Sequence, residues 1–202
     1  QGEIPFVSLS CDVLPELREY ERTATAVVDA YIKPVVNSYL KNLREHLDGI
    51  GIDSPILVMQ SNGGIISETA AANHPVHIIE SGPAAGVIAA VAGGAAAGRE
   101  NLITIDMGGT TAKASVIERG ELTLAAEYEV GGGFSRGSRL IKGGGHLIRV
   151  PAIDISEVGA GGGSIAWVDA GGVMRVGPES AGADPGPACY GLGGERPTVT
   201  DA

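Results

Sequence analysis

Apolar residues between positions 27 and 47 repeat with the spacing of an α-helix. They fall on two adjacent helical rows, one of Val27, Tyr31, Val35, Tyr39, Leu43 and Leu47 and one of Val28, Ile32, Val36 and Leu40. This pattern predicts a long amphipathic helix over residues 27–47 that is buried along one side. Pro34 lies inside it and is expected to kink the helix near Ala30, whose carbonyl the ring displaces.

Short apolar or alternating runs on either side of this helix predict β-strands. The expected strands cover residues 6–10, 55–60, 76–79, 102–106, 114–117 and 122–124. Ser81 is expected to cap a helix of small residues that starts near Pro83 and ends near Ala97. Residues 1–130 are therefore predicted to form an α/β core, in which the strands at 102–106 and 114–117 are neighbours covered by the helices at 27–47 and 83–97.

The texture changes after Val130, where glycine triplets occur at residues 131–133, 143–145 and 161–163. One hairpin is clear, with residues 165–168 running against 173–176 across a turn at 169–172. Glycine is the outlier of the composition, at 32 residues, and its spacing fits neither collagen nor a flexible linker. We therefore expect residues 131–202 to form a glycine-rich region of loops and short strands attached to the core.

Charge and cysteine content narrow the possible partners and compartment. The net charge is −10 with only 14 Lys and Arg residues, so the chain has no basic surface for nucleic acid or an anionic membrane. No apolar run approaches the roughly 20 residues that span a bilayer. Cys11 and Cys189 make neither a disulfide framework nor a paired metal site, and we expect buried, inert thiols in a soluble, cytoplasmic protein. Because the chain starts at Gln1 and ends at Ala202 without a tail, it is expected to be an excised fragment.

Residues 106–111, with the sequence Asp-Met-Gly-Gly-Thr-Thr, carry the main candidate chemistry. A strand that ends in Asp106 and is followed by Gly108, Gly109, Thr110 and Thr111 lets bare N–H groups and hydroxyls surround a phosphate, while the carboxylate faces its metal ion. Glycine is needed because a side chain would block the approach. The local pattern fits a simple tight hairpin equally well.

Competing motifs fail their structural tests. The absence of any Gly-Lys pair excludes a P-loop, and no glycine triplet stands between a clear strand and a long helix as a dinucleotide fingerprint requires. Residues 133–137 match the G-x-S-x-G pattern of a serine hydrolase, with Ser135 as nucleophile and His146 as a possible base. That motif needs a helix after the serine, and the sequence instead reaches another glycine triplet at residue 143.

Four runs together resemble the A-type subunits of the hydantoinase/oxoprolinase family, which include N-methylhydantoinase A and the acetone carboxylase beta subunit. They are residues 57–64 (LVMQSNGG), 81–87 (SGPAAGV), 106–110 (DMGGT) and most of 158–202. The resemblance implies an actin-like ATPase with ribonuclease-H-like halves, built on a mixed sheet with flanking helices. Residues 106–111 would be its second phosphate loop, and residues 81–97 the helix that precedes this loop.

The resemblance also implies a set of site residues. ATP would bind with Mg²⁺ or Mn²⁺, and Asp106 would act in catalysis and orient the metal, possibly through water. Gly108, Gly109, Thr110, Thr111 and Lys113 would contact the nucleotide. Several relatives end this loop in aspartate where this chain has Lys113, which either pairs with a phosphate or a substrate carboxylate or points to solvent.

The implied activity is ATP-dependent phosphorylation and opening of cyclic amides or imides such as hydantoins and 5-oxoproline. The alternatives are a ketone carboxylase subunit and a non-catalytic scaffold subunit. The expected partners are a small cyclic amide or ketone and a B-type hydantoinase subunit. Because the first phosphate loop and the adenine-binding elements should lie outside residues 1–202, the fragment alone is expected to be inactive.

Other polar residues are expected to be structural or exposed. They are His74, His77, His146, Glu80, Asp154, Asp169 and Asp184, which show neither metal-ligand spacing nor an identifiable partner. Cys189 is expected in the core rather than as a nucleophile, because no activating base is near it in the sequence. By resemblance, Asn62 and Gly63 are expected to line the cleft.

Overall fold

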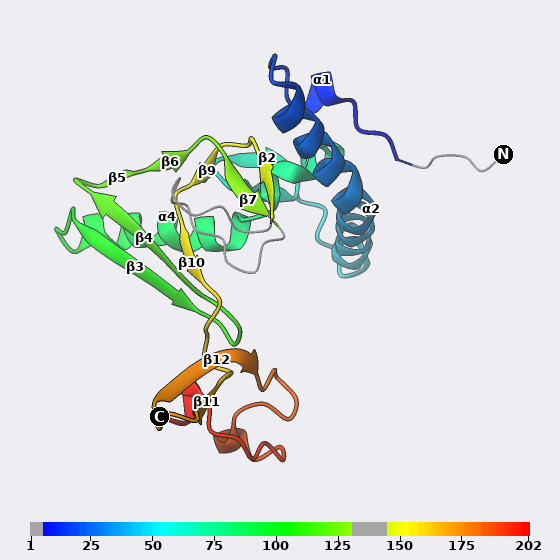
Figure 1. Ribbon diagram of the computed structural model, residues 1–202. Helices are drawn as coiled ribbons and strands as arrows, with labels where there is room; N and C mark the ends of the chain where they lie inside the picture. Colours follow the sequence, from blue (N-terminus) through cyan, green and yellow to red (C-terminus); the bar gives the residue numbers. More distant parts are fainter. Residues whose placement is uncertain (1–5, 131–144) are drawn as a thin grey trace.

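The computed structural model describes residues 6–130 and 145–202. Helices and short antiparallel sheets make up the larger part of the molecule (Figure 1). A small unit containing β11 (Ser164–Val168) and β12 (Met174–Ser180) lies beneath the tip of the hairpin formed by β3 (Leu102–Met107) and β4 (Ala112–Glu118). Strand β10 (Ser156–Val158) runs from the larger part towards this unit. The chain is therefore a mixed α/β protein whose two parts meet near the tip of one hairpin.

The N-terminal helices are α1 (Ser10–Val13) and α2 (Glu19–Gly49), and α2 continues through Pro34. The long helix was predicted correctly. Of its two apolar rows, the one with Val28, Ile32, Val36 and Leu40 is half-buried or buried as expected, but most of the other row is not. Tyr31 is 83% exposed, and its row neighbours Val27, Val35 and Tyr39 are exposed too. The strand expected at residues 6–10 is also wrong, because residues 6–9 have no regular structure and Ser10 begins α1.

The buried face of α2 is largely polar, with Thr25, Asp29 and Lys33 buried beside Leu40. Asp29 Oδ2 accepts a 2.6 Å hydrogen bond from the Ser8 hydroxyl and lies 3.4 Å from Lys33 Nζ. Lys33 Nζ also donates to the carbonyl of Val7 at 3.1 Å.

The chain after α2 forms a β-hairpin and two short helices. Strands β1 (Leu57–Met59) and β2 (Ile65–Ser67) pair antiparallel, and α3 (Glu68–Asn73) follows with Ser67 accepting a capping bond from the Ala70 N–H. The strand expected at residues 76–79 is instead the 3-10 helix η1 (Pro75–Ile78). Pro75 at its first turn has a φ that suits a helix, and His77 N–H donates to the carbonyl of His74.

Helix α4 (Ser81–Ala96) packs against β3 (Leu102–Met107) and β4 (Ala112–Glu118), as expected. Its small residues permit close approach, because a Cβ on Gly94 would lie 2.8 Å from the carbonyl oxygen of Arg99. Its N-cap is Glu80 with no side-chain bond, so the expected Ser81 cap is wrong. The core beneath it contains Ala84, Val87, Ile117 and Ile153.

The sheet beside α4 has the order β10–β4–β3, with β5 (Glu121–Leu122) also pairing with β4. Five further strands flank the segment at residues 131–144. Strand β6 (Leu124–Ala125) pairs with β9 (Ala152–Ile153), β7 (Tyr128–Val130) pairs with β8 (His146–Ile148), and β10 spans Ser156–Val158. Every ladder among the described residues is antiparallel rather than mixed. Helix α2 packs against α1, α3, η1 and β8, so it does not cover β3 and β4 as expected.

The C-terminal unit is built on the predicted hairpin of β11 (Ser164–Val168) and β12 (Met174–Ser180). Two 3-10 turns follow, η2 (Ala188–Tyr190) and η3 (Val199–Asp201). The Asp201 carboxylate accepts bonds from the N–H groups of Ala188, Cys189 and Thr198, which ties the two turns together.

Two expectations drawn from composition have different outcomes. Cys11 and Cys189 are both exposed, so the expected burial of these thiols is wrong. Cys11 lies in the one-turn helix α1 and Cys189 in the 3-10 helix η2. Over residues 6–130 and 145–202, no helix is long and apolar enough to cross a membrane.

Candidate anion-binding site

Asp106 lies near the end of β3, and the chain turns through residues 108–111 into β4. The Gly108 N–H donates to the carbonyl of Thr111 at 3.0 Å, which closes this 108–111 loop. In the ladder below it, Asp106 stands opposite Lys113 and Met107 opposite Ala112. The expected order of strand, glycine loop and strand is therefore confirmed.

The 108–111 loop presents N–H groups that the protein does not use. Those of Gly109, Thr110 and Thr111 have no acceptor among the described residues, and the two threonine hydroxyls have no partner there either. A Cβ built on Gly109 would meet no atom within 4 Å. A loop of unpaired N–H groups beside open space is suited to binding an anion.

The carboxylate of Asp106 is exposed and forms no ion pair or hydrogen bond with any described residue. Lys113, its neighbour across the ladder, instead places Nζ 2.8 Å from Glu80 Oε2 and 3.8 Å from Glu157 Oε2. With its side chain only 18% exposed, Lys113 does not point freely into solvent. Glu80, which showed no partner in the sequence, therefore has one, and Lys113 does not pair with Asp106.

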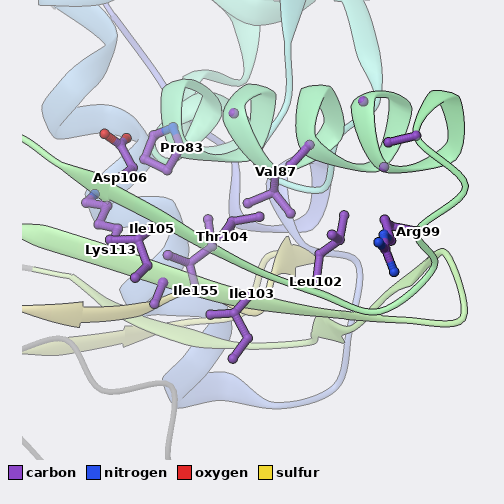
Figure 2. A pocket seen from close by; sticks show the side chains of 16 residues that line it. Pro83, Val87, Arg99, Leu102, Ile103, Thr104, Ile105, Asp106, Lys113 and Ile155 are labelled. Atoms are coloured by element: carbon purple, nitrogen blue, oxygen red, sulfur yellow. The ribbon is translucent and has the colours of Figure 1, made fainter.

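A cavity of about 460 Å³ lies between α4 and the β3–β4 hairpin, with Asp106 and Lys113 at one end. Figure 2 shows Asp106 beside Pro83 near the start of α4, while Val87 and Leu102 lie deeper along the helix. The wall of this cavity is otherwise mostly aliphatic. The free carboxylate thus stands at the mouth of an apolar space next to the 108–111 loop.

The glycine turn at residues 161–163 contacts the 108–111 loop directly. Gly162 N–H donates to the carbonyl of Gly108 at 2.9 Å, and Gly163 N–H donates to the carbonyl of Gly109 at 2.7 Å. A second cavity, of about 390 Å³, lies beside this contact and is lined also by Pro187, Tyr190 and Thr200. The sequence placed this triplet in a glycine-rich region of loops and short strands but gave no sign of its contact with a loop about 50 positions away.

The remaining candidates lie away from the loop. Asn62 Oδ1 accepts from the Gly64 N–H, and Gly63 has φ 85° and packs near Ile88 and Ile153, so both shape the β1–β2 turn. Asp169 accepts from the N–H groups of Gly171 and Val173 and pairs with Arg175, which is structural as expected. No group of three His, Cys, Asp or Glu side chains that could hold a metal occurs among the described residues.

The serine hydrolase motif is not tested by this structure. Residues 133–137, including Ser135, lie outside the described residues. His146, its possible base, is exposed at the start of β8. His74 and His77 lie together instead, with ring centroids 6.4 Å apart in an edge-to-face arrangement.

The fold and the site define an α/β protein with a glycine-rich loop between two antiparallel strands, in which N–H groups and the preceding carboxylate of Asp106 have no partner among the described residues. The family model described as hydantoinase/oxoprolinase matches residues 22–202. The chain belongs to this hydantoinase/oxoprolinase family.

The relatives are larger proteins. An uncharacterised protein of Methanocaldococcus jannaschii is 53% identical over 97% of this chain, which spans 29% of that protein. The caprolactamase subunit alpha of Pseudomonas jessenii is 40% identical over 98% of this chain, which spans 26% of that subunit. The chain therefore corresponds to little more than a quarter of these relatives.

Two solved structures resemble the fold. The nucleotide-free structure of acetone carboxylase, from work on ATP-dependent acetone carboxylation, has a TM-score of 0.73 and 28% identity, covering 95% of this chain and 25% of the other. The ATP-dependent caprolactamase of Pseudomonas jessenii has a TM-score of 0.69 and 40% identity, covering 97% of this chain and 26% of the other. The arrangement of elements described above is thus shared with an acetone carboxylase and an ATP-dependent caprolactamase.

Proposed function

We propose that residues 106–111 form the second phosphate loop of an actin-like ATPase, whose ribonuclease-H-like halves hold a nucleotide between them. One observation carries this proposal: three N–H groups of the 108–111 loop, and the carboxylate of Asp106 just before it, have no partner among residues 6–130 and 145–202. We further propose that residues 1–130 belong to the ATPase core and residues 131–202 to a glycine-rich region of the same domain. Strands β8, β9 and β10 of this region pair with strands of the core.

The proposed nucleotide is ATP with Mg²⁺ or Mn²⁺. Asp106 offers a single carboxylate, and Mg²⁺ is commonly held by one or two carboxylates together with water and phosphate oxygens, so the residues fit this ion. Asp106 would hold the metal directly or through its waters. Gly108, Gly109, Thr110 and Thr111 would surround a phosphate, and Lys113 would add positive charge nearby while still paired to Glu80.

The proposed activity of the whole enzyme is ATP-dependent opening of cyclic amides or imides, such as hydantoins and 5-oxoproline. The family match and the likeness to a caprolactamase subunit support an amide substrate. The nucleotide supplies a phosphoryl group that turns a poor carbonyl electrophile into one with a good leaving group. The residues of this chain would position the nucleotide. The N–H groups of the 108–111 loop would hold its phosphate, and the carboxylate of Asp106 would orient the metal ion.

A ketone carboxylase is the second candidate, because the acetone carboxylase structure matches this fold at a TM-score of 0.73. In either case we propose a B-type subunit as partner, a small molecule as substrate and the cytoplasm as location. Turnover of ATP by the complete polypeptide and its B-type partner, assayed with hydantoins, 5-oxoproline, caprolactam and ketones plus bicarbonate, separates the candidates. Amide-dependent turnover supports the first, and turnover that requires both ketone and bicarbonate supports the second.

Two substitutions in the complete enzyme test the site. Asp106→Asn keeps the shape and removes the charge, so ATP turnover should fall at least about 100-fold, the scale on which loss of one key electrostatic group acts. The thermal midpoint should not change, because Asp106 has no partner within the described protein. Gly109→Val places a branched side chain in the open space of the loop, so nucleotide affinity should fall together with turnover.

A simple structural hairpin predicts the opposite order of effects. Asp106→Asn would then be nearly silent, because a turn needs only a polar residue at that position, and Gly109→Val would affect stability alone. An Asp106→Asn enzyme with parental turnover removes the loop from the mechanism. The isolated fragment of residues 1–202 is expected to be nearly inactive, and robust ATP hydrolysis by it would contradict the proposed division of the cleft.

A further inference from the structure

The direction of the unpaired N–H groups in the 108–111 loop follows from the hydrogen bonds that its carbonyl groups accept. A trans peptide is planar, so its C=O and N–H point in opposite directions. The carbonyls of Gly108 and Gly109 both point to the glycine turn, where Gly162 and Gly163 donate to them. The N–H groups of the same two peptides, which belong to Gly109 and Thr110, therefore both point away from the turn. Two successive N–H groups on one side form a concave anion-binding surface.

The glycine turn can hold these carbonyls only because it lies against the loop backbone. A Cβ on Gly161 would stand 2.6 Å from the Gly108 carbonyl oxygen, 2.7 Å from Thr111 N and 2.8 Å from Gly109 C. All three atoms are backbone, so no side chain could rotate away to make room. Any residue other than glycine at position 161 must displace the loop or the turn.

The glycine turn at residues 161–163 is in turn held by hydrogen bonds from η3. Thr200 donates twice to the carbonyl of Gly162, from its N–H at 2.9 Å and from its hydroxyl at 2.8 Å. Asp201 accepts from the N–H groups of Cys189 and Thr198 and so holds η3 in place. A chain of contacts thus runs from Asp201 through Thr200 and Gly162 to the loop.

We propose that the glycine turn and Thr200 position the 108–111 loop, so that the N–H groups of Gly109 and Thr110 converge on one phosphate group of the bound nucleotide. Gly161, Gly162, Gly163 and Thr200 are positioning residues that touch the loop or the turn rather than the ligand. This inference rests on the proposed nucleotide-binding function. The glycine-rich region would then contribute to the affinity for phosphate by holding the 108–111 loop in place.

The first test is Gly161→Ala in the complete polypeptide, with Gly171→Ala as the matched control. Gly171 lies in the β11–β12 turn, away from the 108–111 loop, and a Cβ there meets only a carboxylate oxygen of Asp169, at 3.3 Å, and no backbone atom. Binding of a non-hydrolysable ATP analogue with Mg²⁺, and of adenosine, is measured by calorimetry. Gly161→Ala should weaken the ATP analogue at least about 10-fold and leave adenosine unchanged, because only the analogue has phosphates; Gly171→Ala should change neither.

Thr200 provides a milder second test in case Gly161→Ala does not fold. Thr200→Val keeps the shape and removes the hydroxyl bond to Gly162, whereas Thr200→Ser retains that bond. The valine variant should bind the ATP analogue about 3- to 10-fold more weakly, as expected for loss of one hydrogen bond of ordinary strength, and the serine variant should restore the affinity. Adenosine binding should be parental in both.

The outcomes separate this inference from the function on which it rests. If the parent protein binds the ATP analogue but folded Gly161→Ala and Thr200→Val variants bind it equally well, the positioning role is wrong and the nucleotide site stands. The positioning role is also wrong if adenosine and the analogue weaken in parallel, because the effect is then a general loss of structure. If the parent protein binds no nucleotide, the proposed function itself fails.

Discussion

The two ends of the described chain are held together by different groups. The N-terminal region, which comprises residues 6–49 and the η1 segment at 74–79, is fixed by buried side chains. The glycine-rich end, residues 161–202, is fixed mainly by backbone groups that approach closely where side chains are missing. Each region should therefore be sensitive to a different kind of substitution.

Asp29 is the centre of the N-terminal region. It is 0% exposed, and its two oxygens accept from the Ser8 hydroxyl and from the backbone N–H of Val76, while Lys33 supplies the opposite charge. One carboxylate thereby joins α2 to the segment before α1 and to η1. The same role is played at the other end by Asp201, but that carboxylate gathers mainly backbone N–H groups around tight turns.

The largest expected effect in this comparison is that of Asp29→Leu. It leaves Lys33, whose side chain is only 10% exposed, without its countercharge and leaves the Val76 N–H without an acceptor. Removal of one partner of a buried pair costs about 3–5 kcal/mol. Urea unfolding should show a loss of this size, whereas Asp48→Leu at the exposed end of the same helix should cost less than about 1 kcal/mol. Equal losses for the two variants would mean that the polar face of α2 is not what anchors it.

Gly194→Ala probes the glycine-rich end with a smaller expected effect. A Cβ at this position would overlap the carbonyl oxygen of Gly186, so the local backbone must shift. We expect a loss of about 1–3 kcal/mol, the range for overpacking a filled site. Faster amide exchange should be confined to residues 182–202, with α2 unaffected.

The matched substitution in the N-terminal region is Gly49→Ala, at the end of α2, where a Cβ meets no atom within 4 Å. Alanine is a better helix former than glycine by up to about 1 kcal/mol, so this variant should be neutral or slightly more stable. The same chemical change thus has opposite signs in the two regions. If Gly194→Ala also proves neutral, the close backbone approach is not a constraint.

The sequence predicted those elements whose local pattern agrees with their surroundings. The helix α4, the β3–β4 hairpin and the β11–β12 hairpin were all expected, because small residues, alternation and turn residues marked them. The periodicity of α2 predicted the helix and one of its two inward rows. It missed the buried Asp29 and Lys33, whose polar groups are satisfied by each other and by partners distant in sequence. The 3-10 turn η1 was mistaken for a strand because a short apolar run fits either element.

In the candidate site, too, the contiguous residues were predicted from the sequence and the contacts between distant segments were not. The strand, glycine loop and strand around Asp106 follow from local pattern, since the residues that form it are contiguous. The pairing of Lys113 with Glu80, and the contact between residues 161–163 and the 108–111 loop, join segments 33 and about 50 positions apart. A single sequence has no local pattern that encodes such contacts, so they required the three-dimensional arrangement.

The smallest expected effect concerns pH and again separates the two regions. Burial lowers the pKa of His77 below its ordinary value of about 6.5, and the nearby His74 lowers it further, while Asp29 opposes them. The folded protein therefore binds this proton less readily than the unfolded chain does. As the pH falls below about 6.5 towards the folded pKa, the unfolded state takes up more protons and the free energy of unfolding decreases.

His77→Gln should remove this part of the pH dependence, while His146→Gln, at an exposed position in β8, should leave it intact. The glycine-rich end should respond only at lower pH. Hydrogen bonds from backbone N–H groups, chiefly that of Cys189, hold the pKa of Asp201 well below its ordinary range, so its contribution is present above the unfolded pKa near 4 and is lost as the pH falls through the folded pKa. Urea unfolding at several pH values between 7 and about 4.5 measures the His77 slope alone, because Asp201 contributes no slope above its unfolded pKa near 4. A slope that persists in His77→Gln would place the titrating group elsewhere and remove the pH contrast between the regions.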